Sequence, residues 1–286
     1  MIFQKFGEKM KKINANQMWL WGYTLEQIPG NMPFVEGKTY CSLETGAKYL
    51  GCDNVFWMNS IHTLKEPSEK NCRLLKDFKQ ICCGLTHLET RGFGRGGWEL
   101  HYVESARKAG RLSKKIPSIT GVMLDDFHVA GPSQDITPKE LAEINDALKS
   151  ENPDLELNLV MYRRQTADEY APYAESFDGI SFWDDSSNPY YWNTLYRDQI
   201  AEFRQRFPEK KIIQGQFMHD FWHDNKPMPM EILELQCDII AEQLERGNID
   251  GWAVIQNGFF CRTSHRRQTE YLRNFWAWYN GCHTTR

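Results

Sequence analysis

The stretch Ile119-Thr-Gly-Val-Met-Leu-Asp-Asp-Phe-His-Val-Ala-Gly131 decides the fold that this chain is expected to adopt. Its first half, Ile119 to Leu124, is a short apolar run of the kind that a strand buried on both faces needs. Two carboxylates, Asp125 and Asp126, follow at once, with His128 just beyond them. Parallel α/β folds place their chemistry outside the carboxyl ends of the strands. The stretch therefore predicts a buried parallel strand whose acids serve a functional site, rather than acids that only cap a turn or pair with an arginine.

Seven other apolar runs alternate with helix signals along the rest of the chain. The clearest signal is Thr137-Pro138 with Glu140, a capping box with proline at the first helical position. The expected strands cover residues 18–23, 54–58, 80–86, 119–124, 155–161, 179–182, 211–217 and 251–256. Eight strand–helix units in about 250 residues predict an α/β fold, a single (β/α)₈ TIM barrel. The rival, an open doubly wound sheet, usually carries a nucleotide-binding fingerprint after its first strand, and this chain has none there.

The whole chain, 1–286, is expected to form this one barrel domain, with residues 1–16 as a leading arm. With 41% hydrophobic and 25% charged residues, the composition is that of a soluble globular protein. A net charge of -4 and a pI near 6.1 argue against a nucleic-acid partner. No apolar run approaches the roughly 20 residues of a membrane helix, so no membrane partner is expected either. The sequence does not indicate an oligomeric state.

The eight cysteines form no Cys-x-x-Cys pair, and Cys82-Cys83 lie inside an apolar run. They are interpreted as buried, reduced thiols, the alternative being the disulfides of a secreted protein. The first twelve residues lack the apolar core of a signal peptide. A cytoplasmic location is therefore expected, with a leader removed from a longer precursor as the alternative.

Polar and aromatic side chains follow the ends of the predicted strands, where a barrel gathers them on one face. Amide and acidic groups bind hydroxyls, and flat rings pack on the C–H faces of sugars, so the pattern favours a small-molecule or oligosaccharide substrate. The residues expected to bind it are Tyr23, Trp57, Asn59, Glu89, His128, Arg163, Trp183, Gln216, Asp220, Gln256 and Asn257.

Two acidic pairs carry the predicted chemistry, Asp125-Asp126 and Asp184-Asp185. Glycoside cleavage needs two carboxyl groups beside one bond, one protonated and the other ionised. Asp126 is predicted to be the nucleophile or electrostatic stabiliser and Asp185 the general acid/base, with Asp125 and Asp184 tuning them. On an extended strand consecutive side chains face opposite sides, so one acid of each pair is expected to turn away from the mouth.

In this layout the chain resembles the (β/α)₈-barrel glycoside hydrolase superfamily. It is similar to retaining α-glycosidases whose nucleophile follows strand four and whose acid/base follows strand six. A layout with the second acid after strand seven would use Asp220, and Glu89 is a third candidate. No motif of a particular family matches. Arg163 and Arg164 are expected to neutralise Asp125 and Asp126.

Two other functions stay open on the sequence alone. Glu89, Asp126, His128, His219 and Asp220 are metal-ligand types, which would suit a metal-dependent sugar isomerase, lyase or hydrolase. Because no His-x-His or His-Glu-x-x-His spacing is present, no metal and no other cofactor is predicted. The third function is a non-catalytic glycan-binding barrel. The run Gly92–Gly97 is interpreted as a lid over the mouth.

Overall fold

The computed structural model describes residues 17–23, 31–32, 35–38, 41–58, 68–85, 98–127, 136–184, 187–221 and 225–283. Its centre is a closed barrel of parallel strands in which each strand pairs with the next along the chain, and the last pairs with the first. The barrel strands are β1 (Met18–Gly22), β4 (Asn54–Trp57), β5 (Gln80–Gly84), β6 (Ile119–Leu124), β7 (Glu156–Tyr162), β8 (Gly179–Trp183), β9 (Lys211–Phe217) and β12 (Gly251–Ile255). The predicted (β/α)₈ barrel is confirmed, and the open sheet is excluded. The leading arm, 1–16, lies outside the described residues.

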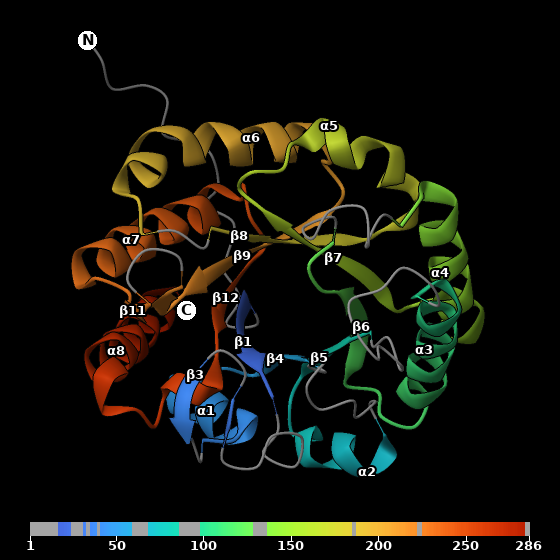
Figure 1. Cartoon of the computed structure of the whole chain (residues 1–286), viewed down its shortest axis with the longest axis horizontal. Coiled ribbons are helices and arrows are strands. Elements are labelled where there is room, and N and C mark those ends of the chain that lie inside the picture. The colour runs from blue at the N-terminus through green and yellow to red at the C-terminus, as the bar shows by residue number, and fades with distance from the viewer. Residues whose placement is uncertain are drawn as a thin grey trace.

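Helices surround the barrel as an outer ring (Figure 1). They are α1 (Leu43–Leu50), α2 (Glu69–Cys72), α3 (Trp98–Ser113), α4 (Pro138–Glu151), α5 (Ala167–Tyr170), α6 (Tyr196–Arg206), α7 (Met230–Arg246) and α8 (Arg266–His283). Short helical turns add η2 (Arg73–Leu75), η3 (Ala171–Ser176), η4 (Tyr191–Leu195), η5 (Asn257–Phe259) and η6 (Thr263–His265). Two small antiparallel pairs lie outside the barrel sheet, β2 (Asn31–Met32) with β3 (Val35–Lys38) and β10 (His219–Asp220) with β11 (Lys226–Pro227).

The helix caps follow the sequence signals. Thr137 accepts a hydrogen bond from the backbone N–H of Glu140, whose side chain in turn accepts from the backbone N–H of Thr137, and Pro138 opens α4. The same reciprocal pair, Thr166 with Glu169, starts α5. These bonds satisfy backbone donors that the first turn of a helix leaves free, so they fix where each helix begins after its strand.

Large aromatic side chains fill the barrel interior beneath the mouth. The ring of Trp183 meets those of Trp21 and Phe217 edge-on, with 5.2 Å between ring centroids in both pairs. Trp183 also covers Gly215 on the neighbouring strand, where an added Cβ would lie only 2.0 Å from the indole. Only glycine fits at that position. With 2% of its surface exposed, Trp183 lies at the carboxyl end of β8 but is almost fully covered by the described residues.

The described cysteines with characterised side chains are free thiols. Five of them are buried, namely Cys41, Cys52, Cys82, Cys83 and Cys237. Cys261 is exposed, so the prediction of buried thiols is wrong for this residue. Within the described ranges, none of the helices combines the length and apolarity needed to cross a membrane.

Candidate active site

The two aspartates of the opening stretch lie in a turn, Asp125 to Phe127, that begins where β6 ends. Asp126 adopts a left-handed backbone conformation, with φ of 50°, which is uncommon for a residue other than glycine and is found at functional sites. Its backbone N–H donates a hydrogen bond to Oδ1 of Asp125 at 3.0 Å. Because the chain is no longer extended here, the alternation of side chains along a strand stops at Leu124.

The turn is anchored in the helix layer by its third residue, Phe127. Its ring is 2% exposed and packs against Tyr170 and Tyr173, with centroid distances of 5.6 and 5.3 Å. Its carbonyl oxygen accepts hydrogen bonds from Nε2 of Gln165 at 2.9 Å and from the hydroxyl of Tyr170 at 3.1 Å. The buried ring and the two donors hold the backbone on which the acids stand.

Asp126 is bound by a tyrosine from the neighbouring strand. Tyr162, the last residue of β7, donates its hydroxyl proton to Oδ1 of Asp126 at 2.7 Å. Tyr162 is itself held in place, because its backbone N–H donates to Oε1 of Gln165 at 2.7 Å and the guanidinium of Arg164 lies 4.7 Å from its ring centroid. The hydrogen bond from Tyr162 fixes the orientation of the Asp126 carboxyl.

Asp125 stands in different surroundings. Asp125 is an exposed residue of the turn, although protein atoms crowd around its carboxyl group. Burial, followed by the negative charge of Asp126, raises the pKa of Asp125 well above its usual range, and the N–H of Asp126 opposes the shift only in part. The two adjacent acids therefore differ in their surroundings, and Asp125 keeps its proton to a higher pH than an ordinary aspartate does.

Two buried tyrosines lie within electrostatic reach of both acids. Tyr23 follows β1, and Tyr102 lies near the start of α3. Burial raises the pKa of each phenol above its usual range, and the charges of Asp125 and Asp126 add to the shift, in that order. The expectation that one of the two acids turns away from the mouth stays a prediction, although the turn replaces the extended chain on which it was based.

In the second acidic pair, Asp184-Asp185, the contacts of the first acid differ from those of Asp125 and Asp126. Asp184 is fully buried, and its Oδ1 lies 3.0 Å from Nε of Arg163. The Arg163 guanidinium also lies 5.3 Å from the ring centroid of Tyr191 at the start of η4. The expectation that Arg163 neutralises Asp125 and Asp126 is wrong, since its ion pair with Asp184 ties the ends of β7 and β8 together. Asp185 lies outside the described residues.

Three of the residues expected to bind substrate are enclosed by protein contacts. Asn257 is fully buried, donates to the carbonyl oxygens of Tyr23 and Cys41 at 2.9 and 2.8 Å, and accepts from the N–H of Tyr23 at 3.0 Å. Gln216 is fully buried and accepts from Nε1 of Trp252 at 3.0 Å, toward the helix layer. Trp57 is fully buried as well. The hydrogen bonds of Asn257 and Gln216 connect parts of the fold, and the substrate-binding role of these two residues and Trp57 stays a prediction.

The other expected residues are distributed as follows. Gln256 is buried at the end of β12, and Asp220 is buried and accepts a hydrogen bond from Oγ of Ser187 at 2.5 Å. Tyr23 and Arg163 lie at the mouth, as described above. The remaining ones lie outside the described residues, namely Asn59, Glu89 and His128, together with the run Gly92–Gly97.

His219 forms a hydrogen-bonded pair with a second histidine. Its Nδ1 lies 3.0 Å from Nε2 of His265, and its Nε2 lies 2.9 Å from Oδ1 of Asn225. Burial, with the nearby His219 and Arg262, lowers the pKa of His265 to about 4. Among the described residues, no three His, Cys, Asp or Glu side chains gather as metal ligands would.

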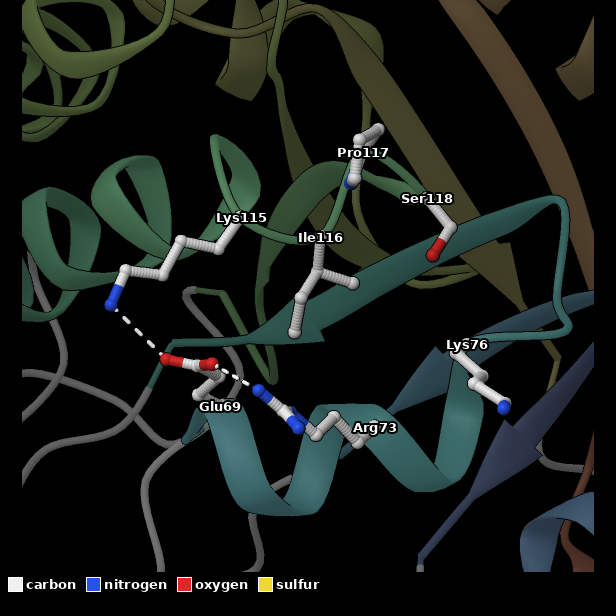
Figure 2. A pocket seen from close by; sticks show the side chains of 7 residues that line it. All are labelled: Glu69, Arg73, Lys76, Lys115, Ile116, Pro117 and Ser118. Atoms are coloured by element: carbon white, nitrogen blue, oxygen red, sulfur yellow. Dashed lines mark hydrogen bonds and ion pairs between the residues drawn. The ribbon is translucent and has the colours of Figure 1, made fainter.

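A cavity of about 630 Å³ lies at the opposite end of β6 from the acids. It is lined by Glu69, Arg73, Lys76, Lys115, Ile116, Pro117 and Ser118. Figure 2 shows the carboxylate of Glu69 between Lys115 and Arg73, with ion-pair distances of 3.1 and 2.7 Å. Because catalysis in such barrels takes place at the carboxyl ends of the strands, this cavity at the amino-terminal face is separate from the candidate active site.

The sequence reasoning missed three residues that complete the site, Tyr162, Gln165 and Tyr102. Tyr162 carried a signal, since it ends the strand that follows the acid-bearing one. Gln165 and Tyr102 carried none, because a turn residue and a helical tyrosine have no pattern that points to a particular strand end.

Neither the comparison with protein-family models nor that with curated proteins finds a match to the sequence. Solved structures do match. A family 5 glycoside hydrolase, a mannosidase from Rhizomucor miehei, has a TM-score of 0.61 at 8% identity over 93% of this chain and 94% of that one. A glucosidase from Croceicoccus marinus has a TM-score of 0.60 at 11% identity, and the match covers 94% of this chain but only 66% of the glucosidase.

A third similar structure is a family 128 endo-β-1,3-glucanase from Amycolatopsis mediterranei in complex with laminarihexaose. Its TM-score is 0.53 at 9% identity, over 91% of this chain and 99% of that one. At such identities the likeness is one of fold. The chain has the (β/α)₈ barrel that these glycoside hydrolases have, in agreement with the resemblance seen in its sequence.

Proposed function

We propose that this protein is a glycoside hydrolase whose catalytic carboxyls include Asp125 and Asp126. The observation that carries the proposal is the environment of the two acids at the end of β6. One has a raised pKa, and the other accepts a hydroxyl hydrogen bond at 2.7 Å. Glycoside hydrolysis uses two carboxyl groups in different roles, one that gives a proton to the leaving oxygen and one that carries negative charge.

The roles follow from the surroundings. Asp125 is the general acid that protonates the leaving oxygen, since its raised pKa keeps the proton on it to a higher pH than an ordinary carboxyl would. Asp126, bound by Tyr162, is the charged group that stabilises positive charge at the sugar ring. Asp185, the acid/base expected from the sequence, stays an alternative proton donor.

A carbohydrate substrate is supported by the likeness in fold to known barrels. The similar barrels include a mannosidase, a glucosidase and a glucanase with a bound hexasaccharide. A metal-dependent sugar enzyme has less support, since Asp126 and His219 are occupied by Tyr162 and His265.

The test is a panel of aryl glycosides with the wild type and with Asp125→Asn and Asp126→Asn. Each substitution keeps the side-chain shape, and each is expected to lower kcat by about 10²- to 10⁴-fold with the fold intact by circular dichroism. Asp146→Asn, at an exposed position on α4, is the matched control and should behave as the wild type. Full activity in both acid variants would contradict the assignment, and glycan binding without turnover by the wild type would indicate a non-catalytic barrel.

A further inference from the structure

The first and last units of the barrel meet at a seam where segments far apart in the sequence lie side by side. β12 pairs with β1 in parallel and so closes the sheet. In the outer ring α8 lies beside α1 (Figure 1), and the guanidinium of Arg273 on α8 is 4.9 Å from the ring centroid of Tyr49 on α1. Backbone hydrogen bonds and side-chain packing therefore hold this seam.

Two cysteines lie together at the seam. Cys41 directly precedes Ser42, the N-cap of α1, and Cys261 follows η5 in the segment that leads to α8. The side chain of Cys261 forms a hydrogen bond with the thiol of Cys41, although most of the chain separates the two residues in the sequence. Both are free thiols. The fold itself therefore brings these two sulfur atoms together.

The backbone on either side of the thiol pair is fixed by contacts that do not involve sulfur. Nδ2 of Asn257 donates to the carbonyl oxygen of Cys41 at 2.8 Å. Phe260, the neighbour of Cys261, packs its ring against that of Tyr49, with 5.7 Å between the centroids. The N–H of Phe260 donates to the carbonyl oxygen of Asn257 at 3.1 Å. These contacts hold the segments that carry the two cysteines beside each other.

The two thiols differ in their access to solvent. Cys41 is 2% exposed, whereas Cys261 is an exposed residue. Burial, and then the neighbouring Cys261, raise the pKa of the Cys41 thiol above its usual range. Because the thiolate is the reactive form of cysteine, a dissolved reagent should react first with Cys261, and Cys41 is the inner thiol that would complete a second step.

We infer that Cys41 and Cys261 form a reversible disulfide that closes the barrel covalently, with a low-molecular-weight disulfide as the oxidant. The bond joins the segment that starts α1 to the segment that leads to α8, so it crosses the seam between the first and last units. Neither sulfur belongs to the turn that carries Asp125 and Asp126, so the disulfide is independent of the proposed function.

The reaction balances in two steps of thiol–disulfide exchange. In the first, the thiolate of Cys261 attacks one sulfur of the small disulfide. The S–S bond of the reagent breaks, a mixed disulfide forms on Cys261, and one small thiolate leaves. In the second, Cys41 loses its proton and its sulfur attacks the sulfur of Cys261, which releases the second small thiolate. The two thiolates take up the two protons that the cysteines lost, so two protein thiols are oxidised and the small disulfide is reduced to two thiols.

The first measurement maps the thiols of the folded protein in glutathione buffers that range from fully reduced to fully oxidised, at mildly alkaline pH. After N-ethylmaleimide has blocked the remaining thiols, trypsin should release peptides 39–48 and 247–262 as one linked species from the oxidised samples. Dithiothreitol should return them to two separate peptides. Cys261→Ser should abolish the linked species, whereas the matched control Cys52→Ser, at another buried thiol, should keep it.

The second measurement is the Tm of the oxidised and reduced forms by calorimetry. The disulfide closes a loop of about 220 residues and so restricts the unfolded chain, and oxidation should raise the Tm by roughly 5–15 °C. The rise should be absent from Cys261→Ser and present in Cys52→Ser. Comparing the two forms of each variant removes the effect of the substitution itself, and Cys261 is exposed, so its replacement by serine should leave folding intact.

The possible outcomes decide between a bond built into the fold and a chance pair of thiols. A linked species in the folded protein, with a Tm rise that needs Cys261, supports the inference. A linked species that forms only in denaturant would overturn it, because the fold would then not bring the sulfurs together. A mixed disulfide that stays on Cys261 of the wild type would overturn the second step, and linking without a rise in Tm would overturn the role of the bond in closing the barrel.

Discussion

Replacing Tyr162 by phenylalanine removes one oxygen and tests whether the bond to Asp126 is used in catalysis. The hydroxyl donates to Oδ1 of Asp126 at 2.7 Å, and a hydrogen bond to a charged group contributes about 1.5–3 kcal/mol. If the bond is made with the charged carboxylate in the transition state, kcat/KM should fall by about 10- to 150-fold. The ring, its contact with Arg164 and its backbone bond to Gln165 remain, so the Tm should change little.

Tyr49→Phe is the matched control for this change. Tyr49 lies on α1, also beneath an arginine, with the guanidinium of Arg273 at 4.9 Å from its ring centroid. The same atom is lost there in a similar environment, so kcat/KM should not change. Steady-state kinetics on the best aryl glycoside and thermal unfolding of both variants make the comparison. Unchanged kcat/KM in Tyr162→Phe, or a large loss of Tm with unchanged turnover per folded molecule, would refute the catalytic use of this bond.

Three further predictions concern stability. Gly215→Ala places a Cβ 2.0 Å from the Trp183 ring and should lower the free energy of unfolding by about 3 kcal/mol or more, with a shift in tryptophan fluorescence; an unchanged denaturant midpoint would contradict the packing. Asn257→Ala removes three hydrogen bonds, two of them to Tyr23, and should cost about 3–5 kcal/mol in denaturant unfolding, whereas a mainly substrate-binding residue would raise KM instead. Because the folded-state pKa of Asp125 is raised, its stabilising contribution is present below the ordinary carboxyl pKa of about 4 and is lost as pH rises through the raised value. Asp125→Asn should therefore unfold at higher denaturant than the wild type at pH 8, with the difference vanishing toward pH 4, and a difference that grows toward low pH would contradict the sign.

The barrel was predictable because each of its units carries its own local signals. A run such as Ile119 to Leu124 is apolar throughout, as a strand covered on both faces must be. Capping boxes such as that of Thr137 mark where the chain turns from strand to helix. Sequence spacing also placed the acids after the fourth barrel strand, since the end of an apolar run marks the rim of the sheet. Each of these signals depends on a few adjacent residues only.

The side-chain facing at the rim could not be predicted in the same way. The alternation rule assumes an extended chain, and it fails where Asp126 takes a left-handed conformation. The partner of Arg163 was misassigned because Asp184 and Asp125 are both near the strand ends, and only the three-dimensional packing against Tyr191 selects one of them. Asn257 has an amide group of the kind that binds sugar hydroxyls, but this amide forms hydrogen bonds that join the end of β12 to the end of β1.

The division of labour within the acid turn explains how a costly arrangement of charges is kept. Burial, and then the negative charge of Asp126, raise the pKa of Asp125, so that ionising both adjacent carboxyls is costly and favours any rearrangement that would separate them. The acids themselves do not hold the turn in place. The turn is held by Phe127, whose ring is buried in the helix layer, away from the mouth, and whose carbonyl oxygen accepts two hydrogen bonds there. Since the groups that hold the turn differ from the acidic groups, we expect that the acids can be replaced without loss of the fold. Loosening the contacts of Phe127, by contrast, should displace both acids together. The displacement should extend to Tyr162, because the side chain of Gln165 forms hydrogen bonds with both Phe127 and Tyr162.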